Sequence, residues 1–483
     1  MTKSRRVLSL FNTLTRRVEP VLPVKEGYIS FYTCGPTVYN YAHIGNLRTF
    51  LFQDLLKRTF RAAAYTVTHC MNITDVEDKI IRDSQGGLPA DATNEARHEA
   101  MRALTERFTA IFLEDLETLR IQKADHLPKA TEYIPGMIRL VQELETKHLA
   151  YERDGSVYYR ISGLPEYGCL AHLDREGMQS GASVDADEYE RDSVTDFVLW
   201  KAAKPGEPWW DSPWGPGRPG WHIECSAMGM ELLGDRVDIH SGGVDLIFPH
   251  HENEIAQAEA LTGKTFAKIW VHHGLLTIHD QKMAKSLGNF ITVQDALREH
   301  SVDALKLFFL STHYASSIDY TQEKLRDMDK GVAKFRQLFA RLAAVAQPKL
   351  SVTMNEVEFV LDAKEKIQAA LDADLNTALA LGHIFDLVTA TNRFLDAGRQ
   401  DDYFEGSAHL AGKFLRDILE NIFGMALKVD AAAIASEDEQ MLAERVAARQ
   451  AKEWKRSDEL RDLLKARGII VEDGKTGQTW RRG

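Results

Sequence analysis

Two short segments of the chain carry residues that could handle a polyphosphate. Lys282 and Lys285 lie three residues apart in a segment with a glycine close behind them. The run His43–Asn46 (HIGN) stands between a β-prone stretch and a helical pattern, and its Gly45 would let a nucleotide approach the backbone. The N-terminus of a helix also attracts an anion. Taken alone, each segment also fits a plain structural role, either a solvated basic loop or a histidine at a strand end.

Residues that can bind a metal ion are spread widely through the sequence. The chain has only four cysteines, which are Cys34, Cys70, Cys169 and Cys225. Their spacing does not indicate a disulfide framework in a chain of 483 residues, so burial, catalysis and metal binding all stay open. His250 and Glu254 are four residues apart in a helical stretch and therefore share one face. Spacing alone does not connect the cysteines with this pair, which is more often a surface pair.

A glycine-rich run at 215–220 (GPGRPG) matches the dinucleotide-binding pattern G-x-G-x-x-G, but its context argues against that function. Three prolines lie between residues 205 and 213, so no strand feeds the turn. Two more prolines inside the run remove amides that a phosphate cradle would use. We therefore interpret the run as a rigid loop.

The elements that must position these residues alternate between strand and helix over about the first 110 residues. Residues 28–32 and 65–73 are β-prone, and an amphipathic helical pattern over 47–55 lies between them. Short strand candidates return at 237–239 and 269–271. The order strand, crossover helix, strand predicts an α/β fold with a Rossmann-like parallel sheet.

The remaining segments have a different character. A helix at 132–147 followed by an Asp154-Gly155 hairpin signal indicates an insertion. The pattern is helical from 321 to 427, and the chain ends in one more helix, with Leu442, Val446 and Trp454 on one side, and a short β-like tail. The expected segments are a catalytic domain in two halves (1–120 and 199–270), a connective insertion (121–198), a region with the lysine segment (271–322), an α-helical bundle (323–428) and a small C-terminal α/β module (429–483).

Charge is distributed unevenly along the chain. The net charge is -12, which argues against non-specific nucleic-acid binding by the whole surface. Residues 444–483, by contrast, hold 11 Lys/Arg against 7 Asp/Glu, a local balance of +4. A basic end on an acidic protein suits a polyanionic partner, although a solvated helix face is the commoner explanation. No apolar run approaches the ~20 residues that span a bilayer and no signal-peptide pattern is present, so we expect a cytoplasmic protein.

The two lysines and the HIGN run, some 240 residues apart, together resemble the paired signature of class I aminoacyl-tRNA synthetases, usually His-Ile-Gly-His and Lys-Met-Ser-Lys-Ser. Over essentially its whole length the chain resembles the cysteinyl-tRNA synthetases. The runs that carry this resemblance are Phe31–Arg48, Asn72–Lys79, Asp196–Trp200, Pro219–Met228, Asp238–Gln257 and Lys282–Phe290. Two residues depart from the signatures. Asn46 replaces the second histidine and cannot carry charge, and Ala284 replaces the serine.

The resemblance implies an enzyme that activates L-cysteine with ATP and Mg²⁺ and loads it onto tRNA(Cys). It implies one zinc ion held by Cys34, Cys225, His250 and Glu254. It also implies that ATP is contacted by His43, Gly45, Asn46, Gly243, Asp245, Lys282 and Lys285, of which His43, Asn46, Lys282 and Lys285 act in catalysis. The cysteine pocket would be lined by Gly35, Thr74 and Trp221. The helical bundle and the basic tail would lie on the anticodon side, and we expect a monomer.

The chemistry of cysteine explains why such an enzyme would use zinc. Cysteine and serine differ only by sulfur for oxygen, and a hydrogen-bonding pocket separates such near-isosteres poorly. Zinc prefers soft thiolate and lowers the pKa of a bound thiol. Each ~1.4 kcal/mol of preference gives tenfold discrimination, so no editing domain is needed and the insertion need not be one.

Two other functions remain as alternatives. One is a ligase that joins cysteine to an amino sugar through the same adenylate, although such enzymes lack the full C-terminal part that this chain has. The other, from a different class, is a non-catalytic zinc-containing RNA-binding protein. The lysine segment and His43 argue against the second alternative.

Overall fold

The chain divides into two compact units, which are described separately. A computed structural model describes residues 5–173, 196–279, 281–283, 290–399, 401–427, 436–467, 469–474 and 477–482. The first unit comprises residues 1–426 and the second residues 427–483. Within the described residues, no helix combines the length and apolar character needed to cross a membrane.

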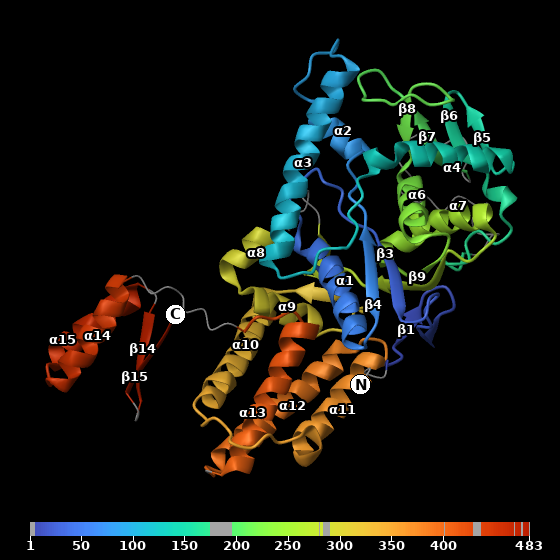
Figure 1. The fold of residues 1–483 in the computed structure, drawn as a ribbon. Helices are drawn as coiled ribbons and strands as arrows, with labels where there is room; N and C mark the ends of the chain where they lie inside the picture. Colours follow the sequence, from blue (N-terminus) through green and yellow to red (C-terminus); the bar gives the residue numbers. More distant parts are fainter. Residues whose placement is uncertain are drawn as a thin grey trace. The chain divides into compact units, whose positions relative to one another are not determined.

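A four-stranded parallel sheet forms the centre of the first unit (Figure 1). Its strands, in spatial order, are β10 (Ala267–His273), β9 (Val237–Gly243), β3 (Tyr28–Thr33) and β4 (Thr66–Met71). Helix α1 (Ile44–Ala62) joins β3 to β4, while α7 (Glu252–Thr262) joins β9 to β10. The two connections leave in opposite directions from the β3–β9 pair, so the switch point of the sheet lies between these strands. The predicted Rossmann-like α/β fold is confirmed.

Helices cover both faces of this sheet, because side chains along each strand alternate between the faces. Phe31 of β3 and Val67 of β4 pack in one core cluster with Phe52 of α1. On the opposite face, Tyr32 packs in a second cluster with Met228 of α6 (Trp221–Leu233). The sheet is therefore a buried layer between α1 and α6.

A large insertion lies between β4 and α6. Its helices are α2 (Asp78–Gln85), α3 (Asn94–Thr118), η1 (Ala130–Tyr133), α4 (Ile134–Thr146) and η2 (Ile161–Gly163). Its antiparallel sheet contains, in order, β5 (Ala150–Arg153), β6 (Ser156–Tyr159), β7 (Phe197–Ala202) and β8 (Gly217–Pro219). Asp154 and Gly155 have φ of 53° and 76°, the left-handed conformations of a tight hairpin turn, as the sequence predicts.

The structure corrects the interpretation of residues 215–220 as a rigid loop. Residues 217–219 form β8, an edge strand that pairs antiparallel with β7. Pro219 is tolerated because an edge strand can omit an amide from the ladder. Gly217 is required for space, since a Cβ atom there would clash with the Trp200 ring and lie 2.5 Å from the Lys201 carbonyl oxygen. Helix α6 begins directly after the run, at Trp221, with Gly220 as its N-cap. The strand in front of it, β8, is antiparallel to β7, whereas a dinucleotide fingerprint follows a strand of a parallel sheet.

A small sheet and a helical bundle follow β10. The sheet contains β12 (Gln281–Lys282), β11 (Leu276–Ile278) and β13 (Ile318–Tyr320), with α8 (Val293–Glu299) and α9 (Val302–Leu310) between β12 and β13. The bundle contains α10 (Gln322–Ala343), η6 (Met354–Glu356), α11 (Glu358–Asp372), α12 (Thr377–Asp396), α13 (Asp402–Asp417) and η7 (Ile418–Ile422). An N-terminal hairpin, β1 (Ser9–Asn12) and β2 (Arg17–Pro20), flanks β10. The predicted helical region is confirmed.

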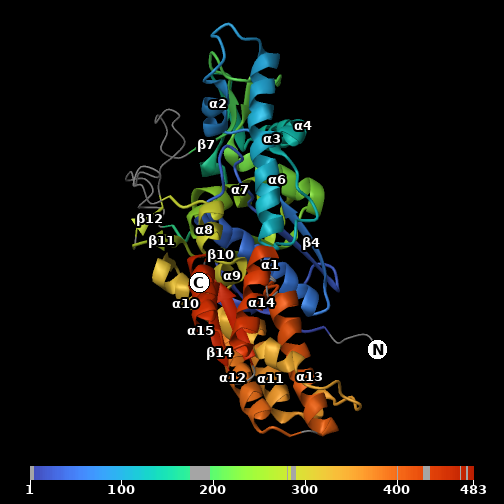
Figure 2. The ribbon, with the colours of Figure 1, turned by 90° about the vertical axis from the view of Figure 1, so that its left-hand side faces the viewer.

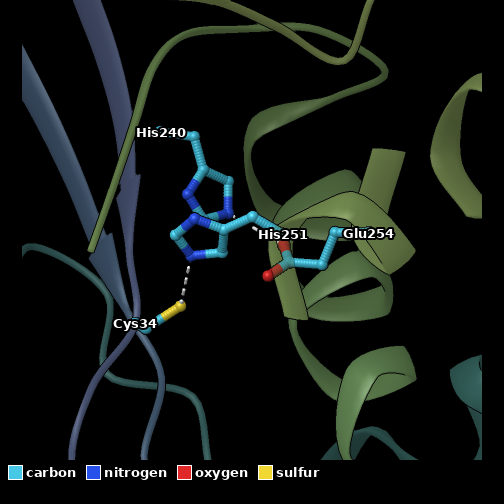
Figure 3. Close-up of side chains that lie close together, drawn as sticks. All are labelled: Cys34, His240, His251 and Glu254. Carbon is cyan, nitrogen blue, oxygen red and sulfur yellow. Dashed lines mark hydrogen bonds and ion pairs between the residues drawn. The ribbon is translucent and has the colours of Figure 1, made fainter. Parts of the chain in front are cut away.

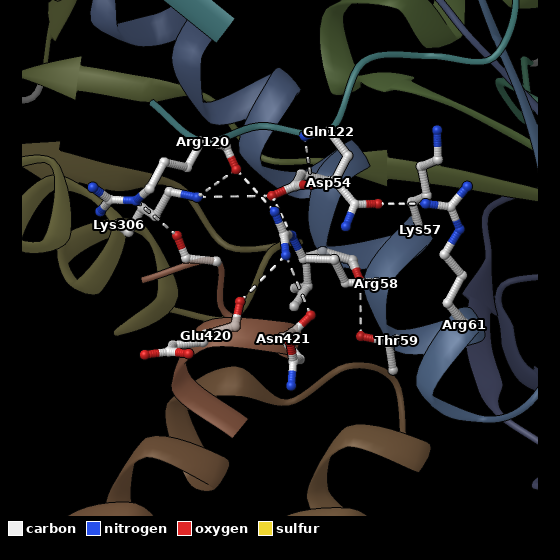
Figure 4. Close-up of polar contacts among 12 residues, drawn as sticks. Asp54, Lys57, Arg58, Thr59, Arg61, Arg120, Gln122, Lys306, Glu420 and Asn421 are labelled. Carbon is white, nitrogen blue, oxygen red and sulfur yellow. Dashed lines mark hydrogen bonds and ion pairs between the residues drawn. The ribbon is translucent and has the colours of Figure 1, made fainter. Parts of the chain in front are cut away.

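The bundle is joined to the C-terminal half of α1, and the two lie side by side in both views (Figure 2). Arg58 of α1 donates to Asp54 Oδ2 (2.8 Å) and to the backbone carbonyls of Glu420 (3.3 Å) and Asn421 (3.4 Å) at the end of the bundle (Figure 4). Lys306 of α9 lies beside the same Asp54, with an Nζ–Oδ2 distance of 3.8 Å. This polar cluster ties the bundle to the helix that begins at the HIGN run.

The second unit is a small α/β module. It contains α14 (Ser436–Gln450), α15 (Trp454–Ala466) and the antiparallel pair β14 (Ile469–Gly474) and β15 (Gly477–Arg482). The expectation of one helix is wrong, because residues 451–453 break it into two. Leu442 is buried as predicted, whereas Trp454 is 56% exposed at the start of the second helix and does not join the apolar side.

Candidate active site and metal centre

The candidate site lies at the carboxyl edge of the parallel sheet. Cys34 directly follows β3, and Thr74 comes shortly after β4. Gly243 ends β9, and the exposed Asp245 follows it. Ligands of open α/β sheets bind at this edge, beside the point where the strand order reverses. The fold thus gathers residues that are over 200 positions apart in the sequence.

Four potential metal ligands converge below this edge. The sulfur atoms of Cys34 and Cys225, a ring nitrogen of His250 and a carboxylate oxygen of Glu254 all lie within 4.8 Å of one another. All four residues are buried. Helix α6 supplies Cys225, while the turn before α7 and the first turn of α7 supply the His–Glu pair. Two thiols, one imidazole and one carboxylate form a donor set that suits zinc.

The electrostatics of these groups fit a bound cation. Burial lowers the pKa of His250 to about 3, so its imidazole is neutral and able to coordinate. Burial raises the pKa of Glu254 to about 8. Its Oε1 atom faces His250 Nε2 at 3.1 Å, yet makes no hydrogen bond to any described residue. A divalent cation between these two atoms would satisfy both.

A second candidate set shares two members with the first. Cys34 and Glu254 also lie within 4.8 Å of ring nitrogens of His240 and His251 (Figure 3). In this set the histidines are already paired, since His240 Nε2 contacts Glu254 Oε2 at 2.8 Å and His251 Nε2 contacts the Cys34 sulfur at 3.2 Å. These contacts are of the kind that orients a ligand from outside the coordination sphere.

Sequence reasoning missed these additional histidines. His251 Nδ1 contacts His272 Nε2 at 2.7 Å, and His272 Nδ1 contacts the Thr13 hydroxyl at 2.7 Å. A chain of polar contacts therefore runs from Cys34 to the N-terminal hairpin. The signal available in the sequence was a pair of histidines at 250–251 and another at 272–273, each beside the end of an expected strand or helix.

The residues expected to line an amino-acid pocket surround the same place. The Trp221 ring stacks on His250 with a centroid distance of 4.3 Å. The Gly35 amide donates to Asn72 Oδ1 (2.9 Å), and a Cβ atom on Gly35 would lie 1.7 Å from the Asn72 carbonyl oxygen, so only glycine fits. Asn72 Nδ2 donates to Thr74 Oγ1 (3.0 Å), which in turn donates to the buried Glu224 (3.1 Å). One hydrogen-bonded chain thus links the pocket residues of β3, β4 and α6.

The HIGN run caps helix α1. Asn46 N donates to His43 Nδ1 (3.2 Å), while His43 N donates to Asn46 Oδ1 (3.2 Å), so each residue caps the other. An imidazole that accepts at Nδ1 carries its proton on Nε2 when it is neutral, which makes Nε2 a donor. Gly45 lies in the first turn of the helix. Asn46 therefore has a structural use at the position where the signature has a second histidine.

The lysine segment is described only in part. The backbone of Lys282 belongs to β12 and pairs with Thr277 of β11. Lys285 and Ala284 lie outside the described residues, as does the side chain of Lys282. Phe290, on the far side of this segment, packs edge-on against the His43 ring at a centroid distance of 5.3 Å. The described end at Phe290 is thus next to the HIGN run.

Three segments of the chain match known protein families. Residues 20–330 match the family described as "tRNA synthetases class I (C) catalytic domain", residues 366–428 match a DALR domain, and residues 431–481 match the "Cysteinyl-tRNA ligase anticodon binding domain". A putative arginyl-tRNA synthetase from Campylobacter jejuni shares the fold with a TM-score of 0.59 at 15% identity, covering 84% of this chain and 95% of the other. A methionyl-tRNA synthetase from Mycobacterium tuberculosis gives a TM-score of 0.61 at 15% identity over 83% and 92%.

The parallel sheet with its site at the switch point, together with the matched catalytic domain, defines a class I aminoacyl-tRNA synthetase. The Cysteine--tRNA ligase of Geobacillus thermodenitrificans is 42% identical over 99% of both chains, and that of Solibacter usitatus is 40% identical over 98% of this chain and 99% of its own. The chain belongs to the cysteinyl-tRNA synthetase family, and the resemblance noted in the sequence is confirmed.

Proposed function

We propose that this chain activates L-cysteine with ATP and Mg²⁺ and transfers the cysteinyl group to the 3′ end of tRNA(Cys). The observation that carries the proposal is the convergence of Cys34, Cys225, His250 and Glu254 under the Trp221 ring. Two thiols, a neutral imidazole and a carboxylate at the base of a pocket suit a substrate that is recognised through its thiol. Family membership supports the same reaction.

The first step joins the cysteine carboxylate to the α-phosphate of ATP and releases pyrophosphate. This step needs positioning and charge neutralisation more than proton transfer. We assign phosphate contacts to His43, through its Nε2 proton, and to the side-chain amide of Asn46. Gly243 and Asp245, at the end of β9, would hold the ribose.

Lys282 and Lys285 would stabilise the departing pyrophosphate together with Mg²⁺. Gly45, in the first turn of α1, would allow the nucleotide to lie close to the backbone. In the second step, a hydroxyl of the terminal adenosine of tRNA attacks the adenylate carbonyl and AMP leaves.

We assign zinc to the set Cys34, Cys225, His250 and Glu254. The two thiols favour this borderline-soft metal, and Glu254 Oε1, which has no hydrogen-bond partner in the described part of the chain, would give it a carboxylate ligand. When bound there, zinc would stabilise a substrate thiolate far better than a serine hydroxyl. Gly35, Thr74 and Trp221 would hold the rest of the amino acid against it.

Binding of tRNA is assigned in part to the C-terminal module. Residues 431–481 match an anticodon-binding domain, and residues 444–483 carry the local positive balance. A match to this domain favours the synthetase over a ligase that acts on an amino sugar. A monomer in the cytoplasm remains our expectation.

Two assays test the function. Cysteine-dependent exchange of pyrophosphate into ATP should be rapid, and the same assay with serine should give very little exchange. The protein should then charge tRNA(Cys) with cysteine and should not consume an amino sugar in its place. A protein that exchanges pyrophosphate but cannot charge tRNA would support the amino-sugar ligase, and one without exchange would support a non-catalytic RNA-binding protein.

A further inference from the structure

A buried arginine connects the HIGN helix with the sheet that carries the lysine segment. Arg48 lies in the second turn of α1 and is only 4% exposed. Its Nη1 atom donates to the Leu275 carbonyl (2.6 Å), and its Nη2 atom donates to the carbonyls of Tyr314 (3.0 Å) and Ser316. All three of these acceptors are backbone oxygen atoms. The charge of Arg48 is therefore satisfied by backbone carbonyls.

These carbonyls belong to the two segments that lead into β11 and β13. The segments are already in close contact, because Ile318 N donates to Leu275 O (3.0 Å) and Gly274 N donates to Tyr314 O (2.9 Å). A Cβ atom on Gly274 would lie 2.6 Å from the Ser316 backbone, so the approach requires glycine. The planar guanidinium closes this junction by donating to both segments at once.

Strand β11 connects this junction to the start of the lysine segment. Thr277 and Ile278 of β11 pair with Lys282 and Gln281 of β12. The backbone of Lys282 therefore lies on the strand that pairs with β11, and β11 begins directly after the carbonyl that Arg48 holds. A shift at Leu275 would move β12 with it.

The other described end of the segment is fixed to the same helix. Ile44 N donates to Ile291 O (3.1 Å), and Val293 N donates to Ala42 O (3.1 Å). His43 and Thr292 form a β-bridge. Residues 42–44 and Arg48 thus hold the chain on both sides of the lysine segment, by backbone contacts on one side and by a single side chain on the other.

We propose that Arg48 is a positioning residue that fixes β11 and β12, the strands that lead into the lysine segment, relative to the HIGN run for the adenylation step. The inference rests on the proposed function, since it needs both segments to act on ATP. Because Arg48 is only 4% exposed and donates to the two strand segments, it would act through them rather than on the substrate. A misplacement of about 1 Å can slow a reaction on the order of 10²-fold. Loss of the junction should therefore lower the rate of adenylate formation.

The test compares three substitutions with a matched control on the same helix. Arg48→Met removes all three donors, Arg48→Gln keeps an uncharged donor, and Arg48→Lys keeps the charge and a reduced set of donors. The control is Lys57→Met, because Lys57 is also buried on α1, donates to the Lys123 carbonyl (2.7 Å) and lies about 13 Å further along the helix (Figure 4). Both Met variants delete a buried cation, but only one deletes the junction.

We expect Arg48→Met to lower kcat of cysteine-dependent pyrophosphate exchange by about 10- to 100-fold, with KM for cysteine and bound zinc unchanged within twofold. Arg48→Lys should recover part of the rate, and Lys57→Met should keep it within twofold even if it lowers the melting temperature. A kcat for Arg48→Met equal to that of the control would overturn the proposal. A loss of zinc or of cysteine affinity along with kcat would also overturn it, because the damage would then be general.

Hydrogen exchange keeps the proposal testable independently of activity. In Arg48→Gln, the amides of Gly274 and Ile318 should exchange at least tenfold faster than in the wild type, while Lys57→Met leaves them unchanged. If these two amides exchange at the wild-type rate in Arg48→Gln, the positioning role is wrong. If the wild type itself shows no exchange of pyrophosphate, the proposed function fails, and the amide measurement still decides whether Arg48 holds the junction. If Arg48→Met does not fold, the same expected and contradicting results apply to Arg48→Lys and Arg48→Gln.

Discussion

Two overlapping ligand sets share Cys34 and Glu254, and the state of the remaining residues separates them. His240 and His251 each already make a short contact to one shared ligand. In the other set, His250 Nε2 faces Glu254 Oε1, an atom that makes no hydrogen bond to any described residue. A metal ion replaces missing contacts more readily than existing ones, because displacing a buried hydrogen bond costs free energy. This favours the set with Cys225 and His250.

The first prediction separates the two sets by metal content. Cys225→Ala and His250→Ala should each lower bound zinc from one per chain to well below half, measured by elemental analysis after dialysis. His240→Gln and His251→Gln should retain zinc with affinity weakened by about 10- to 100-fold, the usual effect of losing an orienting partner. Cys70→Ala, which removes another buried thiol, is the control and should keep its zinc. The opposite order of losses would assign the metal to the histidine-rich set.

The second prediction concerns Lys285. Lys285→Ala should slow pyrophosphate exchange by about 10²- to 10³-fold, as expected on removal of one donor aimed at developing charge. KM for cysteine should barely change, since the lysine acts on the leaving group. A near-normal exchange rate would transfer the role elsewhere, with Lys282 the first residue to test.

The sequence supports prediction of individual site residues only where a motif identifies them. The ligand set came from family resemblance, because no spacing rule joins Cys34 to Cys225 across 191 positions. His240 lies inside the run Asp238–Gln257, but neither spacing nor the resemblance gave it a role, and His272 belongs to no such run. Their contacts became visible only when the fold placed their strands together. Glu224 was missed for the same reason, since its contact to Thr74 joins a helix to a distant strand end.

At the scale of elements, apolar residues recurring every two residues identified the strands of the parallel sheet correctly, and those recurring every 3.6 residues identified the helical region. Errors occurred where tertiary contacts decided the outcome. Residues 217–219 contain glycine and proline and still form a strand, because β7 provides a partner. The break at 451–453 has no proline or glycine, and the second helix is fixed by Leu460 and Leu464 packing inside the module.

The third prediction concerns the polar cluster that joins the bundle to α1. Burial lowers the pKa of Lys306 to about 8 from an ordinary 10.5, with Asp54 and Asp303 opposing that shift and Arg58 and Arg120 adding to it. Between these two pH values the unfolded chain binds more protons than the folded one, so this residue makes stability rise with pH. Below pH 8 Lys306 is charged in both states and contributes no slope.

The measurement is the difference in unfolding free energy between the wild type and Lys306→Met, taken from urea titrations at pH 8 and pH 10. The wild type should gain about 2 kcal/mol relative to the variant over this range. Taking the difference cancels other groups that titrate there. A difference that stays constant with pH would mean that Lys306 keeps its proton as easily as an exposed lysine.

At the scale of the whole molecule, the chemistry and the basic tail belong to separate compact units. Every residue assigned to adenylation lies between Cys34 and Lys285, inside residues 1–426. The second unit has its own small core of Leu442, Leu464, Ile469 and Val471. Its exposed Trp454 lies under the Arg449 guanidinium at 5.6 Å, and such an aromatic–arginine pair can stack on an unpaired base. The side chains of the final tryptophan and arginines lie outside the described ones.

The last prediction separates these units. Removing residues 429–483 deletes the matched anticodon-binding domain and the basic stretch, but keeps the buried Leu427. Cysteine-dependent pyrophosphate exchange should stay within about twofold of the full-length rate, because the adenylate site is untouched. Charging of tRNA(Cys) should fall at least tenfold, since each lost base contact costs ~1–3 kcal/mol and lost phosphate contacts weaken binding further. Charging should also depend less steeply on salt.

The loss should be larger for the correct anticodon than for an altered one, because only the correct one has specific contacts to lose. Equal charging by truncated and full-length protein, across tRNAs with altered anticodons, would show that this unit does not read the anticodon.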